Sequence, residues 1–297
     1  MNPFASFLRP IKRGKHAVED YFHFRPLPGF EPREVLRGGF SSKVIVEELR
    51  KSGICKLERY LDPERLKACR MAWEEMLRSH GEPSPDTPAA IQIPFDCGKG
   101  GVLAGLVLDE LILAAVENYY ERPVYLVGGR AQRLSPIEPY TDKAFQWHHD
   151  AKGKYLKAMW LLNDVPVDGQ RMSYIPGSHR QRRAFTTYQE TRLTEQEARR
   201  TGPVFECAGP AGTVFIFDTN GIHRGNRNRG PIRDTVVGIY SAGRYRMGCS
   251  FEDGKLSHLS AWQKDVLSRS RKASLGILVR YPTCRVEAAP SAERPLS

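Results

Sequence analysis

The sequence lacks long hydrophobic runs and internal repeats. No apolar stretch in its 297 residues approaches the ~20 residues that cross a bilayer, so we expect no membrane span. Residues 1–15 also lack the apolar core of a secretory signal peptide. These absences favour a cytoplasmic protein. The arginine-rich beginning has no acidic residue before Glu19, which leaves a transit peptide as an alternative.

The cysteines lack the spacing of a zinc site. There are six of them, with no C-x-x-C pair: Cys55, Cys69, Cys97, Cys207, Cys249 and Cys284. Zinc sites and disulfide-rich folds are recognised by closely spaced cysteines. The scattered cysteines therefore predict no zinc site, and they suit a reducing compartment.

Acidic residues are too few to balance the basic ones, and the net charge is +11. Such an excess is typical of proteins that bind nucleic acids, membrane surfaces or anionic small molecules. Two arginine clusters, at residues 180–183 and 224–229, flank the segments described below. We expect an anionic co-substrate and substrate to account for them, with no nucleic acid partner. The alternative is a non-catalytic basic binding module, for example for nucleic acid.

Two histidines and an aspartate near the middle of the chain have the spacing of metal ligands. Side chains alternate between the faces of a strand, so His148 and Asp150 point the same way and His149 points to the other face. Their Cα atoms would lie roughly 7 Å apart at about 3.3 Å per residue, which suits two ligands of one cation. The alternative is an ordinary polar strand end, because H-x-D alone is a weak signal.

His223 is the third candidate ligand. It follows residues 214–217, an apolar run that predicts a buried strand. Two histidines and one carboxylate on one face of a metal leave its other positions open, as in the facial triad of non-haem Fe(II) oxygenases. Histidine binds metal in its neutral form, and its reference pKa is about 6.5. We therefore expect metal affinity to weaken below roughly pH 6.

Arg233 and Thr235 form a candidate anion site just before the apolar residues 236–240. A guanidinium donates two parallel hydrogen bonds to a carboxylate, and a hydroxyl two residues further on faces the same side of a strand. Such a pair would hold the distal carboxylate of a dicarboxylic co-substrate bound to the metal. The alternative for Arg233 is a surface ion pair.

With these segments in this order and spacing, the sequence resembles the phytanoyl-CoA dioxygenase family of Fe(II)/2-oxoglutarate-dependent oxygenases, which includes the ectoine hydroxylases. The resemblance runs from about residue 53 to residue 240. The matching segments are WHHD at 147–150, SYIPGSH at 173–179, GTVFIFD at 212–218, His223, and RDT at 233–235.

The resemblance implies that His148, Asp150 and His223 bind Fe(II), with 2-oxoglutarate and O₂ as co-substrates. Decarboxylation of 2-oxoglutarate to succinate would accompany hydroxylation or desaturation of a C–H bond in a small molecule. Halogenating relatives replace the carboxylate that Asp150 supplies, so this chain resembles the hydroxylases.

The resemblance also implies roles around the metal. It assigns 2-oxoglutarate binding to Arg233 and Thr235. Gln132 falls where an amide side chain contacts the co-substrate, with a surface strand glutamine as the alternative. The candidates for contact with the substrate are Trp160, Arg224 and the loop at residues 83–106.

The fold prediction rests on short apolar strands separated by Gly and Pro, which favour a β-sandwich or barrel. The resemblance narrows this to a double-stranded β-helix: a cupin-like jelly roll, mainly β, with helices against one sheet. We expect an N-terminal arm at 1–40, the dioxygenase domain at 41–285 and a flexible C-terminal tail at 286–297. Helices are expected at residues 43–51, 62–80, 108–120 and 257–271, and a long loop at 81–105.

Overall fold

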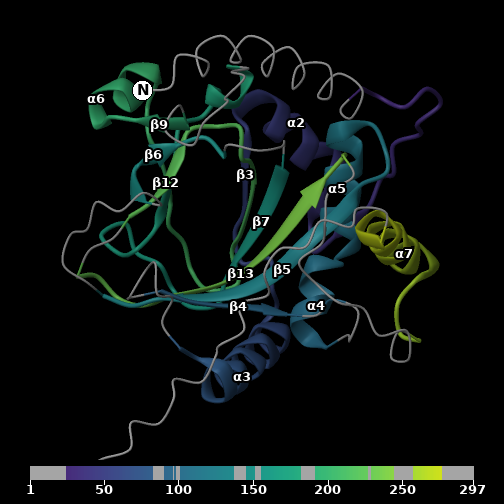
Figure 1. Ribbon diagram of the computed structural model, residues 1–297, viewed down its shortest axis with the longest axis horizontal. Coiled ribbons are helices and arrows are strands. Elements are labelled where there is room, and N and C mark those ends of the chain that lie inside the picture. The colour runs from purple at the N-terminus through teal and green to yellow at the C-terminus, as the bar shows by residue number, and fades with distance from the viewer. Residues whose placement is uncertain are drawn as a thin grey trace, which may run out of the picture.

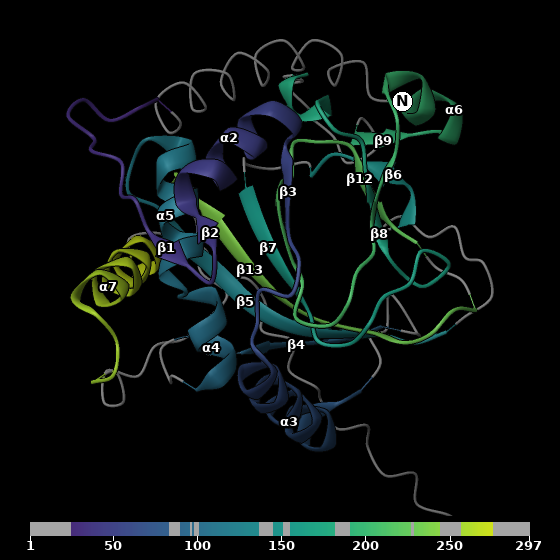
Figure 2. The ribbon, with the colours of Figure 1, turned by 180° about the vertical axis from the view of Figure 1, so that it is seen from behind.

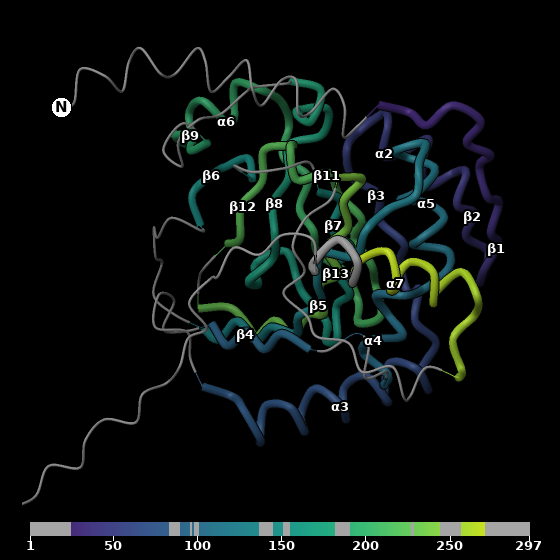
Figure 3. Tube along the Cα trace, turned by 45° about the vertical axis from the view of Figure 1, so that its right-hand side comes forward, coloured from purple at the N-terminus to yellow at the C-terminus, as the bar shows by residue number. Residues whose placement is uncertain are grey.

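The structure, a computed structural model, describes residues 25–82, 90–95, 97, 101–136, 145–150, 155–181, 191–226, 229–243 and 257–275. Two antiparallel sheets form a sandwich, and helices cover the outer face of the larger sheet (Figure 3). Figures 1 and 2 show this arrangement from opposite sides. The predicted jelly roll with helices against one sheet is confirmed.

Within the described residues, the larger sheet has six strands and the smaller one five. The larger sheet runs in the order β3 (Ile54–Leu57), β11 (Val214–Asp218), β7 (Tyr155–Leu161), β13 (Arg233–Ser241), β5 (Tyr125–Leu134) and β4 (Ala90–Phe95). The smaller sheet runs in the order β10 (Phe205–Cys207), β8 (Met172–Tyr174), β12 (His223–Gly225), β6 (Trp147–His148) and β9 (Arg192–Leu193). A separate hairpin pairs β1 (Leu36–Arg37) with β2 (Phe40–Ser41).

Most helices lie on the side of the larger sheet that faces away from the smaller one (Figure 1). They are α2 (Ser42–Ser52), α3 (Pro63–His80), α4 (Val102–Val107), α5 (Glu110–Tyr120) and α7 (Ala261–Leu275). The short α6 (Glu195–Thr201) and the 3₁₀ helix η3 (Ser178–Arg180) belong to the side of the smaller sheet. Among the described helices, none is both long and apolar enough to cross a membrane.

Helix boundaries follow the capping residues. The side chain of Asp62 accepts a hydrogen bond from the backbone N–H of Arg65 at 2.8 Å, which starts α3 as predicted. Helix α2 ends at Gly53, whose φ of 81° favours glycine. A Cβ at Gly53 would also collide with Tyr174 and His179. The glycine therefore lets α2 pack against the smaller sheet beside the site.

The two faces of the larger sheet pack against different layers. Along β7, Ala158 and Trp160 pack in the hydrophobic core between the larger sheet and the helices. Met159 and Leu161 pack in the hydrophobic core between the two sheets. The strand is therefore apolar at successive positions, as expected for a strand buried on both faces. This alternation decides which side chains of the larger sheet reach the space between the sheets.

The loop predicted for residues 81–105 is wrong in part. Residues 90–95 form β4, and α4 begins at Val102. The prolines suggested a loop, but β4 is an edge strand of the described sheet, where a proline such as Pro94 is tolerated because one side of the strand makes no ladder hydrogen bonds. Residues 83–89, 96 and 98–100 lie outside the described part of the chain.

The described part of the predicted arm packs on α5. The backbone of Leu27 donates to the carbonyl of Glu121 at 3.0 Å. Asn118 accepts from the backbone N–H of Arg33 and donates to its carbonyl. Residues 1–24 and the predicted tail at 286–297 lie outside the described residues.

Candidate metal centre

The candidate ligands meet because β6 and β12 are neighbours in the smaller sheet. His148 and His223 are direct cross-strand partners. Their ring centroids lie 4.3 Å apart, on the face of the sheet that looks into the sandwich. The rings of Phe217 and Tyr174 pack against His223 at centroid distances of 5.6 and 6.4 Å. His223 is therefore buried in an aromatic environment, and His148 lies beside it with its side chain 12% exposed.

Asp150 completes the cluster. Its backbone N–H donates to the carbonyl of Thr219 at 3.0 Å, which fixes the chain just beyond β6. Its Oδ1 lies 3.7 Å from Nε2 of His148 and 3.8 Å from Nε2 of His223. One ligand atom from each of the three residues lies within 4.8 Å of the others. That spacing suits three groups that share one small cation.

Backbone carbonyls orient both imidazoles. Nδ1 of His148 lies 2.8 Å from the carbonyl oxygen of Gln146, and Nδ1 of His223 lies 2.8 Å from that of Gly221. A carbonyl oxygen can only accept, so each Nδ1 carries the proton and each Nε2 keeps its lone pair. This is the usual way in which the outer partner of a metal-binding histidine fixes its tautomer.

Burial keeps the cluster in its metal-binding protonation state. Burial, and after it the neighbouring His223, lowers the pKa of His148 to about 3, against the opposing effect of Asp150. Burial also lowers the pKa of His223. Burial alone would raise the pKa of Asp150, but Lys157 and the two histidines hold it below its usual value. Protons should therefore begin to compete with the metal for these imidazoles at a lower pH than the value near 6 expected from the sequence.

Lys157 is a neighbour of the cluster that the sequence reasoning missed. It lies on β7, and its Nζ donates to Oδ2 of Asp150 at 2.6 Å. The lysine thus binds one carboxylate oxygen while the other faces the imidazoles. The available signal was a lysine at an inward position of a strand that is otherwise apolar, since Lys157 alternates with Ala158 in β7.

The predicted co-substrate residues also come together. Gln132 on β5 and Thr235 on β13 are cross-strand partners, and Arg233 lies two residues before Thr235. Thr235 pairs on its other side with Leu161, which belongs to the cluster between the sheets, so Thr235 faces the interior. Within the described residues, Oγ1 of Thr235 is buried without a hydrogen-bond partner. A buried hydroxyl of this kind suits a polar ligand in the sandwich.

A family model matches this chain over residues 49–234, and its description is phytanoyl-CoA dioxygenase (PhyH). The match covers the three clustered residues and Arg233. The chain belongs to the phytanoyl-CoA dioxygenase family. The protein is therefore an iron- and 2-oxoglutarate-dependent oxygenase. Two imidazoles and a carboxylate are the donor set that such an iron site requires.

Solved structures share the fold of this family member. The 2-oxoglutarate-dependent carbocyclase SnoK from nogalamycin biosynthesis has a TM-score of 0.57 at 22% identity, covering 77% of this chain and 94% of that one. EctD from S. alaskensis, with 2-oxoglutarate and 5-hydroxyectoine, has a TM-score of 0.55 at 20% identity, covering 75% and 84%. The epimerase SnoN, in complex with Fe3+ and alpha ketoglutarate, has 0.54 at 19%, covering 67% and 83%. No curated protein matches the sequence.

The structure differs from the expectation for Trp160. This side chain is fully buried, and it points to the helix-covered face of the larger sheet. Its cross-strand partners, Val214 and Val236, lie in the same helix-facing cluster. Strand alternation turns it away from the space between the sheets, where a residue facing the substrate would lie. Trp160 is a core residue.

Arg224 also lies away from the metal centre. It follows His223 on β12, so it points to the outer face of the smaller sheet. Its guanidinium lies 4.4 Å from the ring centroid of Trp147 and donates to Oε2 of Glu195 at 2.6 Å. Glu195 also accepts from the indole N–H of Trp147. Arg224 therefore ties α6 to the outside of the sheet and does not face the substrate space.

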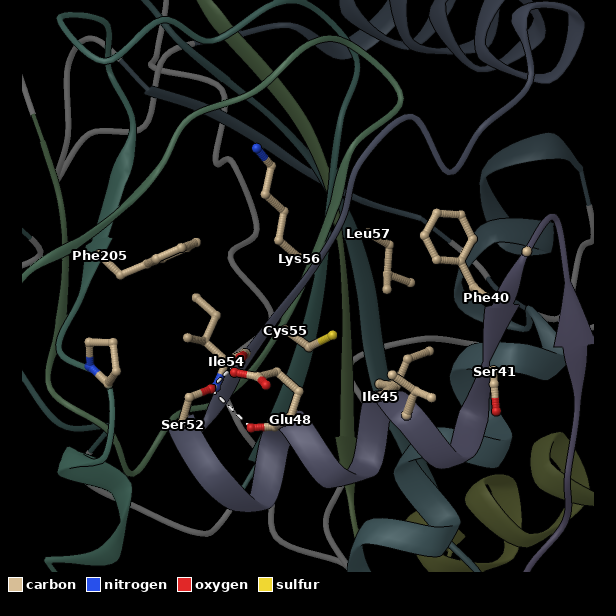
Figure 4. Close-up of a pocket in the computed structure, with 13 residues that line it drawn as sticks. Phe40, Ser41, Ile45, Glu48, Ser52, Ile54, Cys55, Lys56, Leu57 and Phe205 are labelled. Carbon is tan, nitrogen blue, oxygen red and sulfur yellow. Dashed lines mark hydrogen bonds between the residues drawn. The ribbon is translucent and has the colours of Figure 1, made fainter.

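A cavity lies at the edge of the sandwich, between α2 and β3 (Figure 4). It has a volume of about 560 Å³, and its lining includes Ile45, Ile54, Leu57 and Phe205. None of the three clustered residues lines it. The cavity is thus separate from the candidate metal centre.

Proposed function

We propose that this protein hydroxylates a C–H bond of a small organic molecule while 2-oxoglutarate is decarboxylated to succinate. The observation that carries the proposal is the convergence of His148, Asp150 and His223 on one point of the inner face, in a chain of this family. The structures of related fold bind small molecules, as their descriptions state for nogalamycin RO and 5-hydroxyectoine. A reducing, cytoplasmic compartment suits Fe(II) and the scattered cysteines.

In this proposal His148, Asp150 and His223 hold iron(II). The two carbonyls that fix the tautomers keep Nε2 of both rings available, and Lys157 leaves Oδ1 of Asp150 available. Bound iron(II) would activate O₂, the oxidant, with electrons from the decarboxylation of 2-oxoglutarate. Because Asp150 keeps its carboxylate, we propose hydroxylation as the outcome, with desaturation as the second possible oxidation.

Arg233, Thr235 and Gln132 are proposed to bind 2-oxoglutarate. Arg233 is 5% exposed at the start of β13, so a carboxylate bound to its guanidinium would be shielded from water. The buried hydroxyl of Thr235 can donate a hydrogen bond to the same carboxylate. Gln132, directly across from Thr235, can donate a further one from its amide. The arrangement would orient the co-substrate between the two sheets.

The test is 2-oxoglutarate turnover in the presence of candidate substrates. Purified protein with Fe(II) and ascorbate is incubated with pools of small metabolites, and succinate is measured along with a mass increase of 16 in any pool member. The proposal predicts succinate release that depends on one pool and an oxygenated product. An His223→Ala variant is the matched control and should release none. Equal succinate release from wild type and this variant would refute the proposal.

A further inference from the structure

Arg130 is a charged residue of the inner face that the iron and 2-oxoglutarate assignments leave unused. It lies on β5, two residues before Gln132, and pairs across the sheet with Val237. Val237 belongs to the cluster between the sheets, so Arg130 points into the same space as Thr235 and the metal centre. Burial lowers the pKa of Arg130, and the nearby Asp150 carboxylate opposes that effect.

The environment of Arg130 differs from that of Arg133, three positions along the same strand. Arg133 points to the helix side, where it donates two hydrogen bonds to Asp234 and one to Glu74. In the described part of the chain, Nε of Arg130 is buried and has no hydrogen-bond partner. Arg130 as a whole is half-buried, but its Nε is shielded from water and gains no hydrogen bond from the described residues in return, which costs free energy. Such a group persists in a fold when a ligand supplies its partner.

Asp150 cannot be the hydrogen-bond partner of Arg130 when iron and 2-oxoglutarate are bound. One of its oxygens binds Lys157, and the other faces the two imidazoles. Iron(II) would be balanced by Asp150 and 2-oxoglutarate, with Arg233 matching the remaining negative charge. Lys157 and Arg130 then leave a positive excess in the space where the substrate must enter. An anionic group on the substrate would neutralise this excess.

We propose that Arg130 binds an anionic oxygen group of the substrate, a carboxylate or a phosphate, beside the metal centre. This rests on the proposed function, because it places the substrate in the same space as the iron. A guanidinium binds either group through two parallel hydrogen bonds, so the site selects for negative charge and for a pair of oxygens spaced to accept both bonds. The class of substrate is an anionic small molecule.

The first test measures stability without any ligand. Replacing Arg130 by Met removes the guanidinium whose Nε is buried without a partner among the described residues, and it keeps most of the side-chain volume. We expect Arg130→Met to raise the melting temperature of the metal-free protein by about 2–4 °C. Arg224→Met is the matched control, since it loses a paired guanidinium on the outer face, and its melting temperature should fall. A lower melting temperature for Arg130→Met would show a structural role and overturn the proposal.

The second test measures anion binding in protein saturated with Mn(II) and 2-oxoglutarate. The probes are hexanoate, hexyl phosphate and the neutral hexanamide, titrated by calorimetry. In wild type, at least one of the two anions should bind roughly ten- to a hundredfold more tightly than hexanamide. The stronger of the two identifies the anionic group. Arg130→Met should remove this preference, Arg130→Lys should keep part of it, and Arg224→Met should keep all of it.

Two results would overturn the proposal and leave the proposed function intact. One is equal binding of the anions and hexanamide to wild type. The other is an increase in the 2-oxoglutarate Kd of Arg130→Met as large as that of Arg233→Met, which would assign Arg130 to the co-substrate. A failure of wild type to bind Mn(II) and 2-oxoglutarate would instead refute the proposed function, and the same titrations report it.

Discussion

Nζ of Lys157 lies 2.6 Å from Oδ2 of Asp150, while Oδ1 of the same carboxylate lies 3.7 Å from Nε2 of His148. The carboxylate is thus shared between an ammonium group and the side on which a cation would bind. Lys157 and Asp150 are 15% and 23% exposed, so the pair is largely shielded from water. The ammonium group balances the aspartate charge when no metal does.

This ion pair predicts that Lys157 contributes most to the stability of the fold when no metal is bound. Lys157→Met leaves the Asp150 carboxylate without its cation. Breaking a fully buried ion pair costs about 3–5 kcal/mol, and for this partly exposed pair we expect about 1–3 kcal/mol. Saturating Mn(II) should restore most of that loss, because the metal then balances the carboxylate. Thermal melts of wild type and variant, with and without Mn(II), measure it. An equal loss in both conditions would contradict the account.

Arg233 should determine the affinity for 2-oxoglutarate. Arg233→Lys keeps the charge but loses the planar fork, so the change is not conservative. Losing a charged hydrogen bond costs about 1.5–3 kcal/mol, so the KM for 2-oxoglutarate should rise roughly ten- to a hundredfold with metal binding nearly intact. Arg224→Lys, on the outer face, is the control and should leave this KM unchanged. An unchanged KM in Arg233→Lys and Arg233→Ala would show that another residue binds the 2-oxoglutarate carboxylate.

The sandwich-or-barrel fold class and the candidate ligands were predictable because they depend on local pattern, whereas the double-stranded β-helix came from the family resemblance. Strand alternation placed His148 and Asp150 on one face and His149 on the other. In the structure, Nδ1 of His149 contacts the carbonyl of Asn220, and this residue lies outside the cluster. Arg233 and Thr235 followed from the same alternation, since Thr235 lies two residues after Arg233, whereas Gln132 came from the family resemblance. Pairing between β6 and β12 then brings His148 to His223.

Sequence reasoning failed where the answer depended on which sheet face a residue occupies. Trp160 lies on a strand that is apolar on both faces, so its pattern does not tell the inner face from the outer. Lys157 was passed over for the same reason. Arg130 shares β5 with Arg133, and only the packing separates the unpartnered arginine from the paired one. These assignments require the cross-strand register, which the sequence alone does not supply.

Trp160 should contribute to the stability of the fold. It is fully buried between the larger sheet and the helices, and truncating such a side chain to alanine costs about 3–5 kcal/mol. Chemical denaturation of Trp160→Ala should show this loss. The fraction that remains folded should keep the wild-type KM for 2-oxoglutarate. A changed KM with unchanged stability would return Trp160 to the substrate space.

The lowered histidine pKa values predict the pH dependence of stability. In the unfolded chain these imidazoles titrate near pH 6.5, whereas burial lowers the pKa of folded His148 to about 3. Between these values the unfolded state binds more protons, so stability falls as pH falls, by about 1.4 kcal/mol per pH unit for each such group.

The measurement is urea unfolding of the metal-free protein from pH 7.5 to 5. Wild type should lose stability over this range, and His148→Gln should lose it less steeply because one such group is gone. Identical slopes for the two proteins would show that folded His148 titrates as it does in the unfolded chain.

The central claim is that His148, Asp150 and His223 form the iron site. The most direct measurement is an anaerobic titration of Fe(II) with 2-oxoglutarate present, in wild type, His148→Ala and His149→Ala, each checked for folding by circular dichroism. The account predicts a weak visible charge-transfer band in wild type and in His149→Ala, and no band and no iron binding in His148→Ala. Iron binding that survives in His148→Ala and is lost in His149→Ala would contradict it.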